Sequence, residues 1–251
     1  MRKFTRALII AAMLLLAACS LRPGVAPDES GEASRSIDEN SARYEPTEWN
    51  EQEYPDYVCV DGPALGADEA PAAGVIEYGG LDSLGRTQAV VGTITYQMVE
   101  KSRGWRQEFA SDTDDISGWG HNARVSIDLG GGESYHGYLY NRSHLIADSL
   151  GGDASRHNLV CGTRTQNVGK NNGHGGMAYT ETLARDWLNA HHDGTVYYRA
   201  TPVYVGDELV PRSVYVDIKT SDGTIDQHVE VFNCAAGYEV DYKTGSFRKI
   251  G

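Results

Sequence analysis

The feature that most restricts the fold is a series of short β-rich runs in the C-terminal part of the chain. These runs are rich in β-branched and aromatic residues and are separated by turn residues: VYYRATPVYVG (196–206), VPRSVYVDIKT (210–220), HVEVFNCAAG (228–237) and YEVDY (238–242). Short strands that follow one another through short connections usually pair antiparallel. The C-terminal part is therefore expected to form an antiparallel sheet.

Helical and hairpin patterns precede these runs. Residues 124–129 alternate in polarity, Gly130-Gly131-Gly132 marks a turn, and residues 134–140 read as the returning strand of a hairpin. A helix is expected over 156–167, and another over 177–192, where apolar residues recur at helical spacing. Residues 86–100 also have helical spacing, although their β-branched content opposes it. The pattern predicts an α+β domain, with an antiparallel sheet and helices packed on it.

Residues 1–18 have the composition of an export signal. A basic start is followed by an apolar run from Ala7 to Ala18, which is too short for a stable membrane span. The run ends in Leu16-Ala17-Ala18-Cys19, which resembles a bacterial lipobox. That resemblance implies cleavage before Cys19 and lipidation of its sulfur, anchoring the protein to an extracytoplasmic membrane face. An ordinary secretory signal is the alternative.

Residues 19–56 are expected to be the lipidated cysteine and a disordered acidic tether. Ten acidic residues lie between Asp28 and Asp56 against two arginines, and so polar a segment cannot offset its chain entropy by burial. The formal net charge of −13 would oppose a nucleic-acid partner. Most of that charge lies in the tether, because residues 121–170 hold five basic against four acidic residues. Residues 57–251 then form one domain.

Cysteine is sparse outside the signal. An exported chain with three further thiols has one disulfide or none. Cys161 falls in an expected helix, so Cys59 with Cys234 is the pairing to examine first.

The polar cluster Asn141-Arg142-Ser143-His144 ends the expected hairpin. An imidazole with a pKa near neutrality can take a proton from water. The side-chain oxygen of an asparagine such as Asn167 can hold Mg²⁺ without cancelling its charge, and arginine complements phosphate. A base, a metal ligand and an arginine are together the groups that hydrolysis of a phosphodiester needs.

The same residues also have structural explanations. A histidine at a strand end is commonly a surface or hydrogen-bonded residue. Asn158 and Asn167 could cap a helix or lie in a loop, and Glu181 could form a surface pair with Arg185 four residues on. Residue types alone leave both readings open.

The order of three motifs resembles the DNA/RNA non-specific endonuclease family, in the branch of secreted streptococcal-type DNases and nucleases of DNA uptake. The motifs are NRSH (141–144), NLVCGTRTQNVG (158–169) and GGMAYTE (175–181), and GGLDSLGRTQAVVG (79–92) is similar to a further family segment. The similarity extends over about residues 78–245. It implies a ββα-metal finger and Mg²⁺-dependent cleavage of DNA, with Mn²⁺ as a substitute, little sequence preference, 5′-phosphate products and RNA left open.

Carried over by position, the resemblance implies a role for each motif residue. His144 matches the general base and Asn167 the metal-binding asparagine, while Glu181 matches a glutamate that supports the metal through water. Arg142 matches a phosphate-contacting arginine. Asn158 matches a residue with a structural or supporting role. Arg164 is included as a candidate substrate-binding or supporting residue only because it lies close to Asn167 along the expected helix.

Two positions depart from the family motif, and two other functions compete. Asn141 stands where the family has an aspartate and Ser143 where it has a glycine; Asn141 accepts a hydrogen bond but brings no charge. A degenerate relative could bind nucleic acid without cutting it, although His144, Asn167 and Glu181 are all present. A cysteine hydrolase using Cys161 and His144 lacks a nucleophile signature.

Overall fold

The computed structural model describes residues 44–104, 107–111 and 113–250. The expected signal segment and Cys19 therefore lie outside the described residues. Within those residues, no helix is both long enough and apolar enough to span a bilayer.

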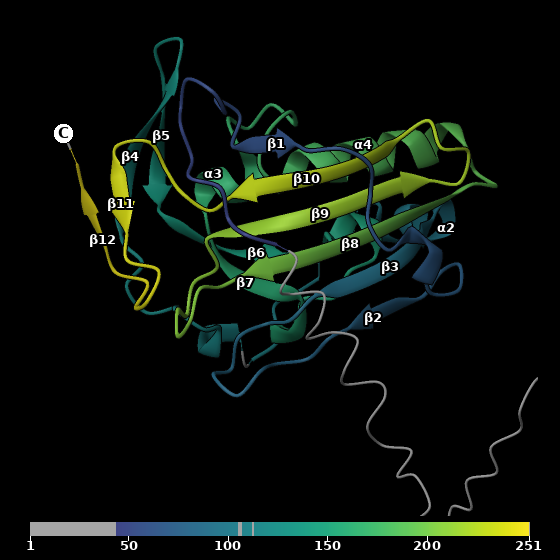
Figure 1. The fold of residues 1–251 in the computed structure, drawn as a ribbon, viewed down its shortest axis with the longest axis horizontal. Coiled ribbons are helices and arrows are strands. Elements are labelled where there is room, and N and C mark those ends of the chain that lie inside the picture. The colour runs from purple at the N-terminus through teal and green to yellow at the C-terminus, as the bar shows by residue number, and fades with distance from the viewer. Residues whose placement is uncertain (1–43, 105–106, 112, 251) are drawn as a thin grey trace, which may run out of the picture.

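A six-stranded antiparallel sheet forms the centre of the fold, in the strand order β1-β10-β9-β8-β3-β2 (Figure 1). Its strands are β1 (Val58–Val60), β2 (Ile76–Tyr78), β3 (Val90–Thr95), β8 (Thr195–Val203), β9 (Ser213–Thr220) and β10 (Asp226–Phe232). Three of the β-rich runs seen in the sequence become the neighbouring strands β8, β9 and β10. The predicted α+β class, with helices on an antiparallel sheet, is confirmed.

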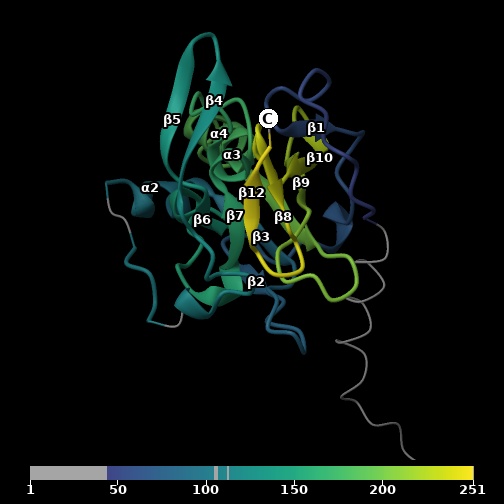
Figure 2. The ribbon, with the colours of Figure 1, turned by 90° about the vertical axis from the view of Figure 1, so that its left-hand side faces the viewer.

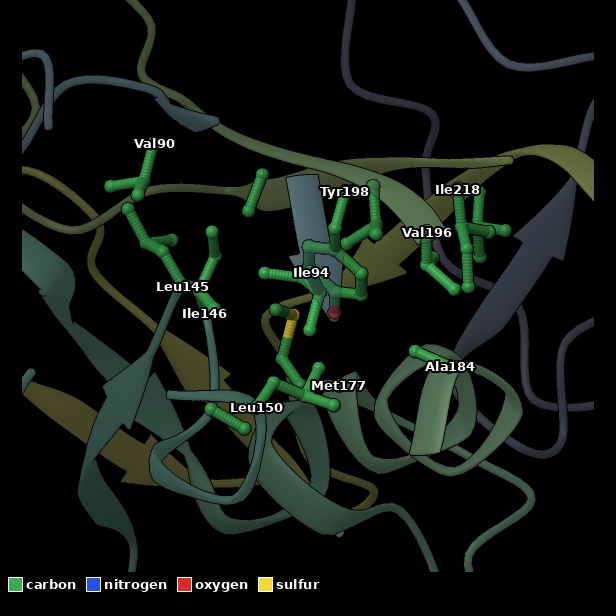
Figure 3. Close-up of a cluster of buried hydrophobic side chains, with 14 of the residues drawn as sticks. Val90, Ile94, Leu145, Ile146, Leu150, Met177, Ala184, Val196, Tyr198 and Ile218 are labelled. Atoms are coloured by element: carbon green, nitrogen blue, oxygen red, sulfur yellow. The ribbon is translucent and has the colours of Figure 1, made fainter. Parts of the chain in front are cut away.

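The helices α2 (Tyr96–Ser102) and α4 (Met177–Ala190) lie on one face of this sheet (Figure 1). Met177, Ala184 and Leu188 are buried and recur at helical spacing, so α4 turns a single apolar stripe toward the sheet. Together with Ile94 and Tyr198 from the strands they form the main core, shown in Figure 3. The helix expected over 177–192 is therefore present, ending at Ala190.

Smaller β units and short helices pack beside the main sheet. The strand pairs are β4 (Arg124–Gly130) with β5 (Glu133–Tyr138), β6 (Tyr140–His144) with β7 (Leu159–Thr163), and β11 (Tyr238–Val240) with β12 (Phe247–Lys249). The 3-10 helices are η1 (Ala67–Glu69), η2 (Thr113–Asp115), η3 (Asp148–Leu150) and η4 (Arg156–Asn158), and α3 (Arg164–Val168) follows β7. Both ribbon views show the β4–β5 hairpin projecting from the body (Figures 1 and 2).

Two sequence-based helix predictions are corrected by the structure. The helix expected over 156–167 is instead η4, strand β7 and the five-residue helix α3. The segment 86–100 forms strand β3 before helix α2 begins at Tyr96. In both segments β-branched or buried apolar residues pair in strands, and tertiary packing overrides the helical spacing. The hairpin of β4 and β5 is present, but His144 ends the next strand, β6.

Residues 44–57, here called the N-terminal strap, were expected to be the end of the tether but contact the sheet. Tyr44 is 5% exposed and stacks on Tyr215 and His228, on the face of β9 and β10 opposite α4. The Tyr44 hydroxyl donates to Asp217 at 3.2 Å. The folded part therefore begins at or before Tyr44, because aromatic burial outweighs the acidic character of the segment.

The cysteines are unpaired, which is one of the two states that the sequence left open, and the expected helical position of Cys161 is corrected. Cys59, Cys161 and Cys234 are free thiols, so the structure contains no bond between Cys59 and Cys234. Cys161 is buried in strand β7 and does not lie in a helix.

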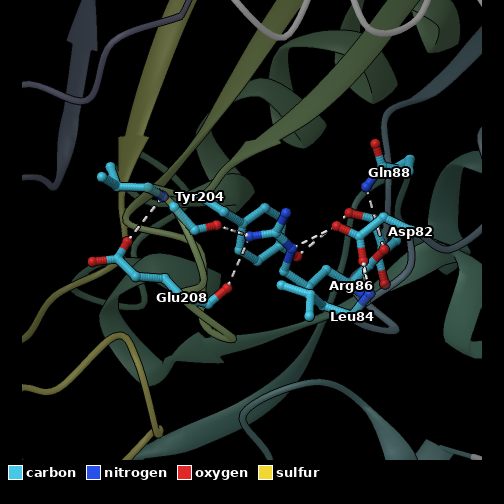
Figure 4. Close-up of polar contacts among 9 residues, drawn as sticks. Asp82, Leu84, Arg86, Gln88, Tyr204 and Glu208 are labelled. Carbon is cyan, nitrogen blue, oxygen red and sulfur yellow. Dashed lines mark hydrogen bonds and ion pairs between the residues drawn. The ribbon is translucent and has the colours of Figure 1, made fainter.

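The LDSLGR segment, residues 81–86, ties together distant parts of the chain (Figure 4). Asp82 accepts from the backbone of Leu84 and from Arg86, whose guanidinium donates to the carbonyls of Gly206 and Glu208. The Thr87 hydroxyl then donates to the carbonyl of Leu159 at 2.7 Å. Thr87, the residue that follows this motif, therefore contacts the first residue of β7.

Candidate active site

The strands β6 and β7 and the helix α3 form a compact ββα finger. The strands pair antiparallel with His144 opposite Leu159, and the Thr163 side chain caps α3 by accepting from the backbone N–H of Gln166. Tyr140 at the start of β6 belongs to a second core beneath the β4–β5 hairpin, whereas Leu145 just after it belongs to the main core. The finger is thus held at both ends of β6.

One side of β6 holds the asparagine of α3 in place. Asn167 donates from Nδ2 to Asn141 Oδ1 at 3.0 Å, and its Oδ1 accepts from the Ser143 hydroxyl at 3.2 Å. Asn141 and Ser143 are two residues apart, so their side chains leave the strand on the same side. Asn167 therefore has its amide oriented by both residues that depart from the family motif.

Close packing between β7 and α3 requires glycine at position 162. A Cβ atom on Gly162 would contact the Gln166 side chain and would lie 2.6 Å from Ser143 Cβ. Since no other residue lacks a Cβ, glycine is needed for Asn167 to approach β6 this closely.

The other side of β6 presents the cation and the imidazole. Arg142 lies over the rings of Trp119 and Phe109, at 4.8 and 5.3 Å from their centroids, and donates from Nε to the carbonyl of Thr113. His144 stacks on Phe109 with 5.9 Å between ring centroids. The candidate base and the candidate phosphate-binding arginine therefore share one aromatic neighbour.

Asn158 is fully buried and bonds only to backbone in the described contacts. Its Oδ1 accepts from the N–H of Ile146, and its Nδ2 donates to the carbonyls of Ile146 and Asp153. Through these bonds it closes the loop between β6 and β7.

Glu181 lies in the second turn of α4 and is half-buried. Desolvation raises the pKa of its carboxyl to about 7, opposed by the nearby Arg185 guanidinium. Arg185 itself donates to Ser149 and Thr182. Within the described part of the chain, no hydrogen bond or ion pair joins Glu181 to Asn167.

Arg164, at the start of α3, lies over the ring of Tyr135 at 4.9 Å from its centroid. Burial lowers the pKa of this guanidinium, and its Nη1 is buried with no hydrogen-bond partner among the described residues. A buried guanidinium N–H without an acceptor is costly, so this cation is suited to an anionic ligand.

A cleft of about 560 Å³ opens beside the finger. Its polar lining comes from Asn122, Asn141, Arg142 and Asn167. Its aromatic lining comes from Phe109, Trp119, Tyr135, Tyr138 and Tyr140. Sequence reasoning missed Asn122 and the aromatic residues. All of them precede NRSH in the sequence, but their gathering around the cleft depends on how the β4–β5 hairpin packs, which local sequence does not encode.

The donor set suits a hydrated ion. Within the described residues no three His, Cys, Asp or Glu side chains gather as a metal cage. Mg²⁺ commonly keeps several waters and binds only one or two protein oxygens. Asn167 Oδ1 retains a second lone pair beyond its bond from Ser143, so the finger fits a sparsely liganded divalent cation.

Cys161 is unsuited to nucleophilic catalysis. It is 0% exposed, its Sγ lies 3.7 Å from the carbonyl of Gly118, and burial raises the pKa of the thiol. A thiol held protonated in a core is inert, which removes the cysteine-hydrolase alternative.

A histidine-bearing strand pair followed by a short asparagine-bearing helix is the finger expected from the motif order. The model of the DNA/RNA non-specific endonuclease family matches residues 68–246. The chain belongs to this family.

Similar proteins agree with this assignment. A deoxyribonuclease of Streptococcus dysgalactiae subsp. equisimilis is 33% identical over 197 residues, which cover 68% of this chain and 59% of the relative. The match thus spans under two thirds of that relative's length.

Solved structures show the same fold. The Sda1 nuclease, solved with a bound zinc ion, aligns with a TM-score of 0.78 at 36% identity, covering 80% of this chain and 100% of that one. NucA from Streptococcus agalactiae, solved with a magnesium ion, aligns with a TM-score of 0.59 at 21% identity, covering 80% and 97%. The second similarity concerns the fold alone.

Proposed function

We propose that this protein is an extracytoplasmic, metal-dependent endonuclease that hydrolyses phosphodiester bonds of DNA with little sequence specificity, with RNA as a second candidate substrate. The observation that carries the proposal is the finger itself. In the finger, Asn167 is hydrogen-bonded to Asn141 and Ser143. Both of these residues belong to β6, the short strand that ends in His144. The family membership and the deoxyribonuclease relative support the same activity.

The side chains divide the reaction between them. His144 takes a proton from water, whose oxygen then attacks phosphorus as the P–O3′ bond breaks. Arg142, from the same side of β6, contacts the phosphate oxygens. Asn167 would hold the divalent ion, and Glu181 would support it through water. A Mg²⁺ ion bound here would neutralise charge on the phosphate and on the leaving oxygen.

Mg²⁺ is the proposed metal, with Mn²⁺ as a substitute. The ligand proposed from this chain is a neutral amide oxygen, which suits hard cations better than it suits zinc. One related structure holds zinc and another magnesium, so the metal is to be determined for this chain by titration.

Lipidation of Cys19 is proposed to hold the enzyme on a bacterial membrane, with DNA or RNA as its other partner. The support is the Leu16-Ala17-Ala18-Cys19 sequence after the apolar run. A solved structure of similar fold, with a TM-score of 0.54 at 20% identity, is of an extracellular endonuclease, and export of this chain would be consistent with that.

Plasmid nicking tests the proposal. The protein should cut with Mg²⁺, stop with EDTA and be unaffected by iodoacetamide, because Cys161 is buried. His144→Ala should lower the rate by roughly 10²–10⁴ with an unchanged circular-dichroism spectrum. Near-normal cutting by that variant would remove His144 from the role. Binding of DNA without Mg²⁺-dependent cutting by the wild type would favour the degenerate relative.

A further inference from the structure

The cleft beside the finger has an aromatic wall that the hydrolytic residues do not explain. Tyr138 is 51% exposed and Phe109 is 38% exposed, and both line the cleft together with Trp119 and Tyr135. Large aromatic side chains are usually buried well beyond this. Exposed rings gathered in a cleft that also contains Asn141 and Asn167 point to a ligand with an aromatic surface.

Cations alternate with these rings. Arg142 lies over Trp119, Arg164 lies over Tyr135 at 4.9 Å, and Arg124 lies over Tyr138 at 5.3 Å. A nucleic-acid strand likewise alternates anionic phosphates with flat bases. Each guanidinium thus stacks on one face of its ring, and both aromatic rings and arginine planes are surfaces on which the bases of unpaired strands stack.

We propose that this aromatic wall stacks on unpaired bases next to the phosphate that is cut, so that the enzyme prefers single-stranded nucleic acid to duplex. This inference rests on the proposed function only for the position of the phosphate. In a duplex the base faces are already stacked on one another, and presenting one to Tyr138 requires unpairing or flipping. Every base has a π face, so stacking is compatible with low sequence specificity.

Tyr138 is the residue on which to test the wall. It pairs with Arg124 across the β4–β5 hairpin, and its carbonyl accepts from the Tyr135 hydroxyl at 3.0 Å. Those backbone interactions do not involve its own ring. Replacing the ring removes its contact with the Arg124 guanidinium but leaves these backbone interactions in place.

The experiment compares binding of two short single-stranded ligands by fluorescence anisotropy, in EDTA to prevent cutting. One is an oligothymidylate, and the other is an abasic sugar-phosphate of equal length and charge. The full-length wild type should bind the base-bearing strand roughly 5- to 150-fold more tightly, the range of one stacked base. Tyr138→Ala should lose most of that preference and Tyr138→Phe should keep it. Tyr96→Ala, a ring on α2 that stacks on His192 outside the cleft, is the matched control.

The outcomes separate the two proposals. Equal binding of both ligands by the wild type, or an unchanged preference in Tyr138→Ala, overturns the stacking inference. Cleavage is then measured on single strands and on duplex of the same sequence with Mg²⁺, where the wild type should favour single strands. If the wild type cuts duplex faster, the preference is wrong. If it cuts neither while still selecting bases over the abasic strand, the proposed catalysis fails and the binding site stands.

Discussion

At the scale of the residue, the structure gives a reason why Asn141 can stand where the family motif has an aspartate. Asn141 Oδ1 accepts a hydrogen bond from Asn167 Nδ2, and a carboxylate would accept the same bond. The position thus orients the amide that is proposed to bind the metal, a task that needs an acceptor and not a charge. Orientation by such a neighbour typically affects metal affinity by about 10- to 100-fold.

Two substitutions separate orientation from charge at this position. Asn141→Asp should keep cleavage at an equal or lower Mg²⁺ concentration, because it adds charge while keeping the acceptor. Asn141→Leu should need roughly 10- to 100-fold more Mg²⁺. Initial rates across a Mg²⁺ titration measure both. Equal Mg²⁺ dependence of the leucine variant and the wild type would show that Asn141 does not orient Asn167.

Gly162 gives a second prediction at this scale. Gly162→Ala should lower the free energy of unfolding by about 1–3 kcal/mol through overpacking, and cleavage should fall because α3 moves away from β6. Adding Ser143→Gly should recover part of the stability, since it removes the atom 2.6 Å from the new methyl group. Thermal unfolding of both variants checks this. If Gly162→Ala alone left stability and activity unchanged, α3 would be shown to accommodate the added methyl group without loss of function.

At the scale of the element, the N-terminal strap is expected to contribute to stability. Asp217 is fully buried and accepts from His228 Nδ1, the Leu65 N–H and the Tyr44 hydroxyl. A chain that starts at Tyr57 should be less stable by about 3 kcal/mol or more, because it uncovers these groups and loses a buried aromatic residue. A chain that starts at Tyr44 should match one that starts at Ser20. Urea unfolding of the three chains measures this.

Point variants keep that prediction testable if the shortened chain does not fold. Tyr44→Phe removes only the hydroxyl bond to Asp217, whereas Tyr44→Ala also removes the stacking on Tyr215 and His228. The alanine variant should be the less stable of the two. Equal stability of all three chains and both variants would mean that the strap is not part of the folded unit.

Sequence-based prediction succeeded best for segments whose pattern fitted only a helix or only a strand. Helix α4 and the strands β8 to β10 have clear patterns and appear as expected. The segment 156–167 was misread because its β-branched and polar residues fit a helix as well as a strand. Its conformation is decided by pairing with β6, between partners such as Ser143 and Val160. The site residues came from motif order, whereas the aromatic wall depends on the placement of the β4–β5 hairpin, which local sequence does not encode.

At the scale of the whole molecule, membrane anchorage gives a further prediction. Cys19→Ala should move the protein from the membrane fraction to the soluble fraction, and a palmitate analogue should label only the wild type. About 25 residues separate Cys19 from Tyr44, and a tether of the kind expected from their composition would have an r.m.s. span of roughly 25–30 Å. The folded part would therefore lie close to the bilayer, at a distance set by the length of this tether. A wild type that takes up no label would rule out the lipid anchor.

The strap also determines when the fold can be completed. Tyr44 bonds to Asp217 across 173 positions of sequence, and β1 pairs with β10, whose residues come near the end of the chain. When the chain is synthesised from its N-terminus, Tyr44 and β1 are therefore made long before Asp217 and β10, their partners. Folding dominated by such distant pairings takes milliseconds to seconds, slower than for helical domains. The strap can therefore reach its native contacts only after β10 has been synthesised.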